Sequence, residues 1–232
     1  MKPQEDNGYT GIENLDVMAE AKNYNTYLAN LVCNNQEPGH ELVDFGAGTG
    51  TFAQMMVDRG YKVICIEPDI ALAERLSAAG LSVYGSIQQV DKIESLYSLN
   101  VLEHIEDDFS TVVNLFGQMK INGKILIYVP AFMVLFTSMD KRVGHFRRYT
   151  KKQLIELFEQ AGFVVDDARY ADSLGFFVTL LFKWFGSNTG EINLRALKIY
   201  DTFVFPLSRF CDFLFSPFFG KNVMLRARKT RA

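Results

Sequence analysis

Short, almost continuous apolar runs alternate with amphipathic stretches along most of the chain. The runs have the length and composition of strands buried on both faces, and they lie at 41–45, 61–67, 81–84, 95–101, 124–129, 163–170 and 222–228. Between them, helical segments are predicted at 49–59, 68–80, 107–120 and 150–163. This alternation predicts an α/β fold, in which a seven-stranded, mostly parallel sheet carries helices on both faces.

The regions outside this alternation are also predicted to be helical. Apolar residues at helical spacing between Glu13 and Asn35 predict one or two helices, which Pro38 and Gly39 end. Asn122 and Gly123 predict a turn before the fifth strand. We therefore expect a single domain over 1–232 with four parts: an N-terminal helical cap (1–37), a core (38–170), a Phe-rich helical insertion (171–220), and a last strand with a basic tail (221–232).

Composition narrows the class of protein. With 232 residues, of which 48% are hydrophobic, the chain is long enough for a sizeable core, and its net charge of -3 gives no case for nucleic-acid binding. Cys33, Cys65 and Cys211 are too scattered for a disulfide framework or a zinc site, so we expect no metal and a reducing cytoplasm. The polar, acidic first residues are unlike a signal peptide, and no apolar run is long enough to span a bilayer.

Three glycines, Gly46, Gly48 and Gly50, fall at alternate positions between the first strand and the helix that follows it. Without Cβ atoms, this turn can approach a ligand closely, and the helix start offers unpaired N–H groups. Thr51 stands where the dinucleotide motif Gly-x-Gly-x-x-Gly has its third glycine. The turn predicts a nucleotide pocket and leaves the kind of nucleotide open.

Polar residues follow the second and fourth strands, at the sheet edge where ligands of open α/β sheets bind. Glu67 closes the second strand, where its carboxylate could accept both ribose hydroxyls of a nucleotide. It could instead be a solvated charge at a helix N-terminus, but its position after the glycine turn favours the ribose role. The spacing alone also suits NAD. The segment 100–104 follows the fourth strand, and from the residues alone it is equally well explained as an ordinary loop.

Four motifs in order, DFGAGTG (44–50), IEPD (66–69), SLNVLEHI (98–105) and GKILIYVPA (123–131), together resemble those of Rossmann-like, class I methyltransferases that use S-adenosylmethionine (SAM). The resemblance covers about residues 20–170 and is closest to the branch with small-molecule and lipid-precursor acceptors. It implies a methyltransferase that converts SAM to S-adenosylhomocysteine.

The resemblance also implies roles for particular residues. Glu67 would hold the ribose, Pro68 and Asp69 would flank the adenine, and Tyr24 would cover the cofactor. An acidic residue that this family often has near the adenine is replaced here by Ser86, so a hydroxyl or backbone contact substitutes for it. The full set of cofactor-binding candidates is Tyr24, Asp44, Gly46, Ala47, Gly48, Thr49, Gly50, Glu67, Pro68, Asp69, Ser86, Ile87, Asn100, Val101 and Leu102.

Two alternatives to a methyltransferase remain at this stage. An NAD(P)-dependent Rossmann oxidoreductase fits less well, because Thr51 replaces the glycine that allows close helix–strand packing, and the NVLEHI segment has no role in it. A non-catalytic SAM-binding protein would carry the same cofactor motifs.

The acceptor side of the site is predicted from the histidines and a basic run. His104 and His145 follow the fourth and fifth strands and are the candidates for a base that accepts a proton from an acceptor oxygen, less readily nitrogen or carbon. A structural role is as probable for each; the neighbours of His145 favour it, since 140–152 carries six Lys or Arg residues against one acid. Arginine suits a phosphate or carboxylate, so the substrate-binding candidates are Asp140, His145, Arg147, Arg148 and Tyr149.

The sequence GHFRRYT (144–150) resembles bacterial methyltransferases linked to glycan or lipid-linked sugar pathways. The acceptor is therefore expected to be small, and anionic, hydrophobic or lipid-linked. The Phe-rich insertion and the basic tail permit peripheral contact with an anionic membrane. A lid over the sheet or a homodimer interface explains the same apolar surface.

Overall fold

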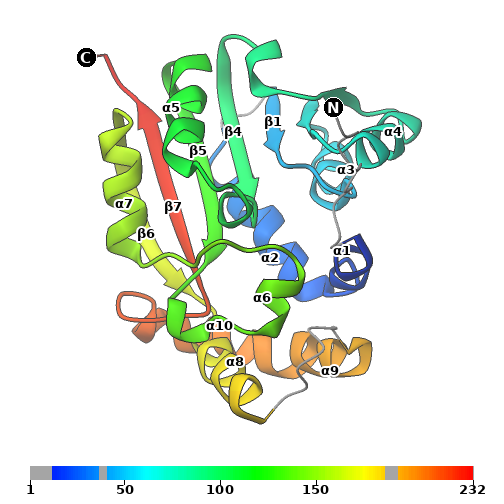
Figure 1. Ribbon diagram of the computed structural model, residues 1–232, viewed down its shortest axis with the longest axis vertical. Coiled ribbons are helices and arrows are strands. Elements are labelled where there is room, and N and C mark those ends of the chain that lie inside the picture. Colours follow the sequence, from blue (N-terminus) through cyan, green and yellow to red (C-terminus); the bar gives the residue numbers. More distant parts are fainter. Residues whose placement is uncertain (1–11, 37–40, 186–192, 232) are drawn as a thin grey trace, which may run out of the picture.

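The computed structural model describes residues 12–36, 41–185 and 193–231. Seven strands form one sheet in the order β3-β2-β1-β4-β5-β7-β6 (Figure 1). Strands β1 to β5 are parallel, whereas β7 runs antiparallel between β5 and β6. The bounds are β1 Leu42–Phe45, β2 Val63–Ile66, β3 Ser82–Tyr84, β4 Ile93–Leu99, β5 Met119–Pro130, β6 Phe163–Ala171 and β7 Asn222–Lys229. The predicted seven-stranded, mostly parallel sheet is confirmed.

Helices cover both faces of this sheet because its central strands are apolar on both sides. Neighbouring strand residues such as Leu96 and Tyr97 belong to opposite core clusters. One cluster includes Leu115 of α5 and Phe158 of α7, and the other includes Met56 of α3. The helices that precede or connect the strands are α1 Ile12–Met18, α2 Lys22–Cys33, α3 Thr51–Val57, α4 Ile70–Ala78, α5 Asp108–Gln118, α6 Ser138–Arg142 and α7 Lys151–Gln160.

The turn expected at Asn122 and Gly123 is wrong, because both residues lie within β5. They form an irregularity in the strand, where the pairing passes from Ile93 with Met119 to Ser95 with Lys124. Asn122 adopts a φ of 67°, which asparagine tolerates better than most residues. The extra residues therefore bulge out of the ladder instead of ending it.

The Phe-rich insertion is helical, as predicted, and forms α8 Ser173–Phe185, α9 Leu194–Ile199, a π-helical turn at Tyr200–Val204, and α10 Phe205–Phe215. In Figure 1 these helices lie together beyond the carboxyl ends of the parallel strands. Two buried carboxylates fix them: Asp201 accepts from the N–H groups of Asn23 and Tyr24 at 2.9 and 2.8 Å, and Asp212 accepts from those of Asp172 and Ser173.

The insertion thereby caps α2, so the N-terminal cap and the insertion meet over one end of the sheet. None of the helices in the described ranges combines the length and the apolar character that crossing a bilayer requires.

Candidate functional site

A cavity of about 700 Å³ opens at the carboxyl ends of β1, β2 and β4. Its walls come from α1, α2, the glycine turn, the loops after β4 and β5, and the start of β7. Most of the predicted cofactor-binding residues line it, namely Tyr24, Gly46, Ala47, Gly48, Thr49, Glu67, Pro68, Asp69, Ser86, Ile87, Asn100 and Val101. Residues from widely separated motifs thus line one cavity at the carboxyl ends of the strands, which is the location that the sequence predicted.

The glycine turn is shaped by close backbone approach. Gly46 and Gly50 adopt φ values of 83° and 84°, a region that side chains disfavour. A Cβ atom on Gly46 would lie 2.4 Å from Cγ2 of Val101, and one on Gly50 would lie 2.6 Å from Cδ2 of Leu76. Gly46 therefore lets the turn pack against the end of β4, while Gly50 packs the helix start against α4.

Glu67 is buried beside this turn, and its carboxylate accepts from the N–H groups of Gly48 at 2.8 Å and Asp69 at 3.0 Å. Burial raises the pKa of Glu67, and these two backbone hydrogen bonds act in the opposite direction. Each carboxylate oxygen keeps a second acceptor position for a ribose hydroxyl. The cap of α4 is Asp69, which accepts from the N–H of Leu72 at 3.0 Å, so Glu67 is not required for capping.

Three of the cofactor-binding candidates do not line the cavity: Asp44, Gly50 and Leu102. The side chain of Asp44 points into the sheet interior, where burial raises its pKa to about 7. Its Oδ2 atom has no hydrogen-bond partner among the described residues. Since side chains alternate along a strand, a residue two positions before the turn need not face the ligand. Leu102 belongs to the hydrophobic core.

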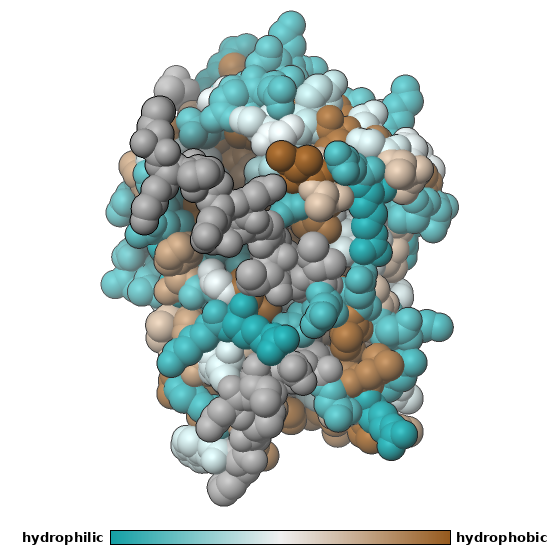
Figure 2. All heavy atoms as spheres, turned by 45° about the vertical axis from the view of Figure 1, so that its right-hand side comes forward, coloured by the Kyte–Doolittle hydropathy of each residue, from teal (hydrophilic) through white to brown (hydrophobic). Residues whose placement is uncertain are grey.

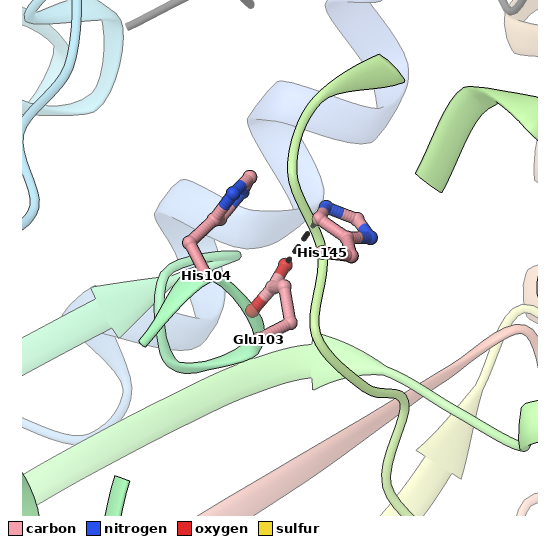
Figure 3. A group of neighbouring side chains, drawn as sticks. All are labelled: Glu103, His104 and His145. Carbon is pink, nitrogen blue, oxygen red and sulfur yellow. Dashed lines mark ion pairs between the residues drawn. The ribbon is translucent and has the colours of Figure 1, made fainter. Parts of the chain in front are cut away.

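Glu103, His104 and His145, hereafter the Glu-His-His cluster, meet in the cavity wall (Figure 3). Glu103 is fully buried, and neither of its carboxylate oxygens makes a hydrogen bond to a described residue. Its Oε1 atom lies 3.9 Å from Nε2 of His145. The two imidazole rings meet edge to face with 4.5 Å between their centroids.

Burial dominates the ionisation of Glu103 and His104. It raises the pKa of Glu103 to about 8, and the positive charge of Arg148 only partly opposes the shift. Burial, with a smaller contribution from the neighbouring His145, lowers the pKa of His104 to about 4. His104 is therefore a neutral imidazole near pH 7.

Asp140 holds His145 from the side opposite to Glu103. The buried carboxylate of Asp140 lies 2.7 Å from Nδ1 of His145 and accepts from Nε of Arg148 at 2.8 Å and Nη2 at 3.0 Å. Thr137 donates its backbone N–H to the same group at 2.7 Å. Although burial alone would raise the pKa of Asp140, hydrogen bonds from His145 and Arg148 hold it well below the usual range. An ionised Asp140 accepts a hydrogen bond from Nδ1–H of His145, which leaves Nε2 directed at Glu103.

The basic run 140–152 does not bring Arg147 and Arg148 together at the cavity, as binding of one phosphate or carboxylate by both would require. Arg147 pairs with Asp108 at 2.7 Å and donates to the carbonyl of Glu106, outside the cavity. Tyr149 also lies outside it and donates to Asp108 at 2.8 Å. Arg148 lines the cavity, but its charge is matched by Asp140. Of the five substrate-binding candidates, only His145 and Arg148 reach the cavity surface.

Lys221 is a cavity residue that the sequence did not indicate. It precedes β7, lines the cavity, and makes no ion pair with any described residue. Its ammonium lies 5.7 Å from the ring centre of Tyr200, and burial lowers its pKa. A strand antiparallel to its neighbours begins where they end, so the residues before β7 lie at the ligand edge. Glu103 is a second cavity residue for which the sequence predicted no role.

Comparisons with known proteins agree with this arrangement. A family model described as a methyltransferase domain matches residues 18–168. The fold is similar to a SAM-dependent methyltransferase from Archaeoglobus fulgidus (TM-score 0.61, 16% identity, covering 90% of this chain and 94% of that chain). It is also similar to the putative methyltransferase solved with the Haloferax volcanii Trm112 activator (TM-score 0.60, 15% identity, 85% of each chain).

A third similar structure is phosphoethanolamine N-methyltransferase 2 of Haemonchus contortus in complex with SAM (TM-score 0.56, 16% identity, covering 88% of this chain and 53% of that chain). No curated protein matches the chain. The fold and the glycine-turn cavity define a class I methyltransferase, and because the family model spans more than half of the sequence, the chain belongs to the methyltransferase-domain family. It is a SAM-dependent methyltransferase, and neither the oxidoreductase nor the non-catalytic alternative gains support.

Proposed function

We propose that this methyltransferase acts on an oxygen of a small acceptor that has an anionic group and a hydrophobic or lipid-linked part. The observation that carries the proposal is the Asp140–His145 pair, which directs an imidazole nitrogen into the wall of the cavity that the glycine turn also lines. SAM, when bound, would supply a sulfonium methyl group to the acceptor oxygen by in-line displacement, with S-adenosylhomocysteine as the leaving group.

The chain's own residues contribute enclosure, orientation and a proton acceptor. Glu67 and the backbone of the glycine turn are placed to hold the donor, while Tyr24 and Val101 close the cavity around it. His145 can accept the acceptor's hydroxyl proton at Nε2, and the buried Asp140 stabilises the resulting imidazolium. Such enzymes gain most of their rate from holding the reacting atoms aligned and excluding water.

An anionic acceptor is supported by the charge of the cavity. Lys221 supplies a basic side chain that makes no ion pair with a described residue, although the charges of Asp172 and Asp140 act on it from farther away. Arg148 lies nearby in the same wall. Lys221, and not Arg147, would therefore bind the anionic group of the acceptor. The remaining wall is mainly apolar, with residues such as Leu15, Phe52 and Leu72, and accommodates the adenine and hydrophobic parts of the ligands.

A lipid-linked acceptor is supported by the exposed faces of α8 and α10. Both helices carry exposed apolar side chains at helical spacing: Phe177, Leu181 and Trp184 on the first, and Phe203, Leu207, Phe210 and Leu214 on and before the second. Phe213 is 88% exposed. Figure 2 shows apolar side chains at the surface in the lower part of the molecule, the level at which Figure 1 places these helices.

The charges around this apolar surface favour an anionic membrane as its partner. In 173–184 and 193–221, the acids Asp201 and Asp212 are buried, so the charged side chains with solvent exposure are Lys and Arg. Apolar side chains surrounded by cations suit the interface of an anionic bilayer. Contact with a membrane would bring the cavity close to lipid-linked acceptors.

The proposed reaction is tested by incubating the full chain with isotopically labelled SAM and a bacterial lipid and small-molecule extract. Mass spectrometry should detect a labelled, methylated, anionic lipid or sugar product together with S-adenosylhomocysteine. The matched control is His145→Asn, which should bind SAM normally but form at least about tenfold less product. Equal product formation by the control, or a product methylated on carbon or nitrogen, would contradict the proposal.

A further inference from the structure

Glu103 is an unexplained group in the cavity wall. It is fully buried, yet both of its carboxylate oxygens are without a hydrogen-bond partner among the described residues. Buried polar atoms are nearly always satisfied, so an exception calls for a missing partner. Its backbone carbonyl accepts from the N–H of Phe146 at 2.8 Å, which fixes the 3₁₀ turn Leu102–His104 against the loop that carries His145.

The neighbours of Glu103 supply the other ligands of a metal site. One ligand atom from each member of the Glu-His-His cluster lies within 4.8 Å of the others, and Oε1 of Glu103 is 3.9 Å from Nε2 of His145 (Figure 3). Ligands around one ion at about 2.0–2.2 Å lie roughly 3.0–3.5 Å apart. The separations in the cluster are longer than this, so binding one ion requires the side chains to rotate toward one another.

The groups behind these ligands also match a metal centre. A histidine that binds a metal through one nitrogen commonly donates its other N–H to a carboxylate or a backbone carbonyl. His145 presents Nε2 to Glu103 while Nδ1 is hydrogen-bonded to Asp140 at 2.7 Å. His104 has a hydrogen bond with the backbone of Val143. The charge of nearby Arg148 is matched by Asp140, so it does not neutralise Glu103.

We propose that Glu103, His104 and His145 bind one divalent transition-metal ion in the wall of the donor cavity. Two imidazoles and one carboxylate suit Zn²⁺, Fe²⁺ or Co²⁺ better than Mg²⁺ or Ca²⁺, which prefer oxygen ligands. The expectation of no metal rested on cysteine spacing and did not consider this cluster. Three protein ligands leave at least one coordination position for a further oxygen.

The role of the ion depends on the proposed methyl transfer to oxygen, whereas its binding does not. An ion at this position would coordinate the acceptor hydroxyl and lower the pKa of that hydroxyl. Nε2 of His145 would then serve as a ligand and not as the proton acceptor. The two roles of His145 exclude each other, and sensitivity of the reaction to a chelator separates them.

Cation binding is tested without any acceptor. Untagged full-length protein is treated with EDTA, moved to metal-free buffer, and titrated with Co²⁺ while its visible absorption is recorded. We expect one Co²⁺ per chain, displaced by Zn²⁺, and at least about tenfold weaker binding for Glu103→Gln and for His104→Asn. The matched control is His40→Asn, which changes the chain's remaining histidine and should bind Co²⁺ as the unaltered protein does.

Two results would overturn the metal site. One is a Co²⁺ affinity that is the same for the unaltered protein, Glu103→Gln and His104→Asn. The other is an equal loss of affinity in His40→Asn. Thermal stabilisation by SAM is measured on every variant, so that loss of fold is not mistaken for loss of the ion. Failure to find a methylated product would refute the proposed reaction and leave this measurement intact.

Discussion

Nδ1 of His145 lies 2.7 Å from Oδ1 of Asp140, a carboxylate that is completely buried and also holds Arg148. One acid thus joins the loop after β5 to the chain segment that precedes α7. The same contact sets which nitrogen of His145 faces the cavity. Stability and ligand geometry at this site therefore depend on a single side chain.

Replacing Asp140 should destabilise the fold. In Asp140→Asn, the buried Arg148 loses its counter-charge, which typically costs about 3–5 kcal/mol. The loss is measured as the free energy of unfolding in urea. The control is Asp107→Asn on the surface, where asparagine caps α5 about as well as aspartate does and the cost should stay below about 0.5 kcal/mol.

The effect of Asp140 should also depend on pH. Because the pKa of Asp140 is held below its unfolded value, its stabilisation is fully present above about pH 4 and is lost as the pH falls through the folded pKa. The difference between the unaltered protein and Asp140→Asn should therefore shrink below pH 4. A difference that is constant down to pH 2 would show that Asp140 does not act through its charge.

Asp44 should have the opposite pH dependence. Burial raises its pKa from 3.8 to about 7, so the folded protein holds this proton more tightly than the unfolded chain. Stability then falls as the pH rises from about 4 to about 7 and is constant above. Asp44→Asn removes this penalty and should stabilise the protein by about 2–4 kcal/mol at pH 8, but little at pH 4.

The measurement for Asp44 is urea unfolding at both pH values. Asp91→Asn, at an exposed position, controls for the change in net charge. A variant that is less stable than the parent at pH 8 would contradict the prediction.

The glycine turn predicts a selective loss of SAM binding. Gly46→Ala places a methyl group against Val101 and should weaken SAM binding by about tenfold or more, since overpacking costs about 1–3 kcal/mol. Gly80 has a similar φ of 82° but has open space where a Cβ would be, so Gly80→Ala controls for backbone strain. Isothermal titration with SAM measures both variants. Equal weakening by the two would assign the effect to strain alone.

Lys221 should determine the affinity for an anionic acceptor. Removing its cation in Lys221→Met should raise the acceptor KM by about tenfold or more, since hydrogen bonds to charged groups contribute about 1.5–3 kcal/mol. The control is Arg147→Met, because Arg147 points away from the cavity and pairs with Asp108. The acceptor KM of both variants is measured by steady-state kinetics with the identified acceptor. A larger increase in the acceptor KM for Arg147→Met than for Lys221→Met would favour the role in anion binding that the sequence suggested for Arg147.

The apolar surface of α8 and α10 should bind anionic vesicles. The double variant Phe210→Ser, Phe213→Ser should reduce co-sedimentation by about tenfold or more, and salt should weaken binding of the parent. Phe109→Ser, at an exposed position on α5, serves as the control. Absence of vesicle binding at low salt would contradict the membrane contact, and a dimer that the double variant dissociates would assign this surface to another copy of the chain.

The strand and helix pattern was predictable because each element has its own local signal. The seven runs of apolar residues correspond to the seven strands, and Thr150 caps α7 as expected. The turn predicted at Asn122 and Gly123 was wrong because asparagine and glycine are typical both of turns and of irregularities within a strand. That Gly46 and Glu67 line one cavity was also predictable, since they lie directly after neighbouring strands of one sheet.

The acceptor side was not predictable to the same extent. Arg147 and Arg148 are adjacent in sequence, yet one lies outside the cavity with Asp108 and the other is in its wall with Asp140. No local pattern shows which carboxylate each arginine will meet.

The sequence by itself determined the fold class through the short-range periodicity of its apolar residues. It indicated SAM as the methyl donor through the resemblance of its four motifs to those of class I methyltransferases. Only the tertiary structure decided that Glu103, His104 and His145 converge, that Lys221 enters the cavity, and that Asp44 does not. The physical reason is that these relationships join residues from different loops. They are set by how the loops after β4 and β5 and the start of β7 meet at one edge of the sheet, which no short stretch of sequence encodes.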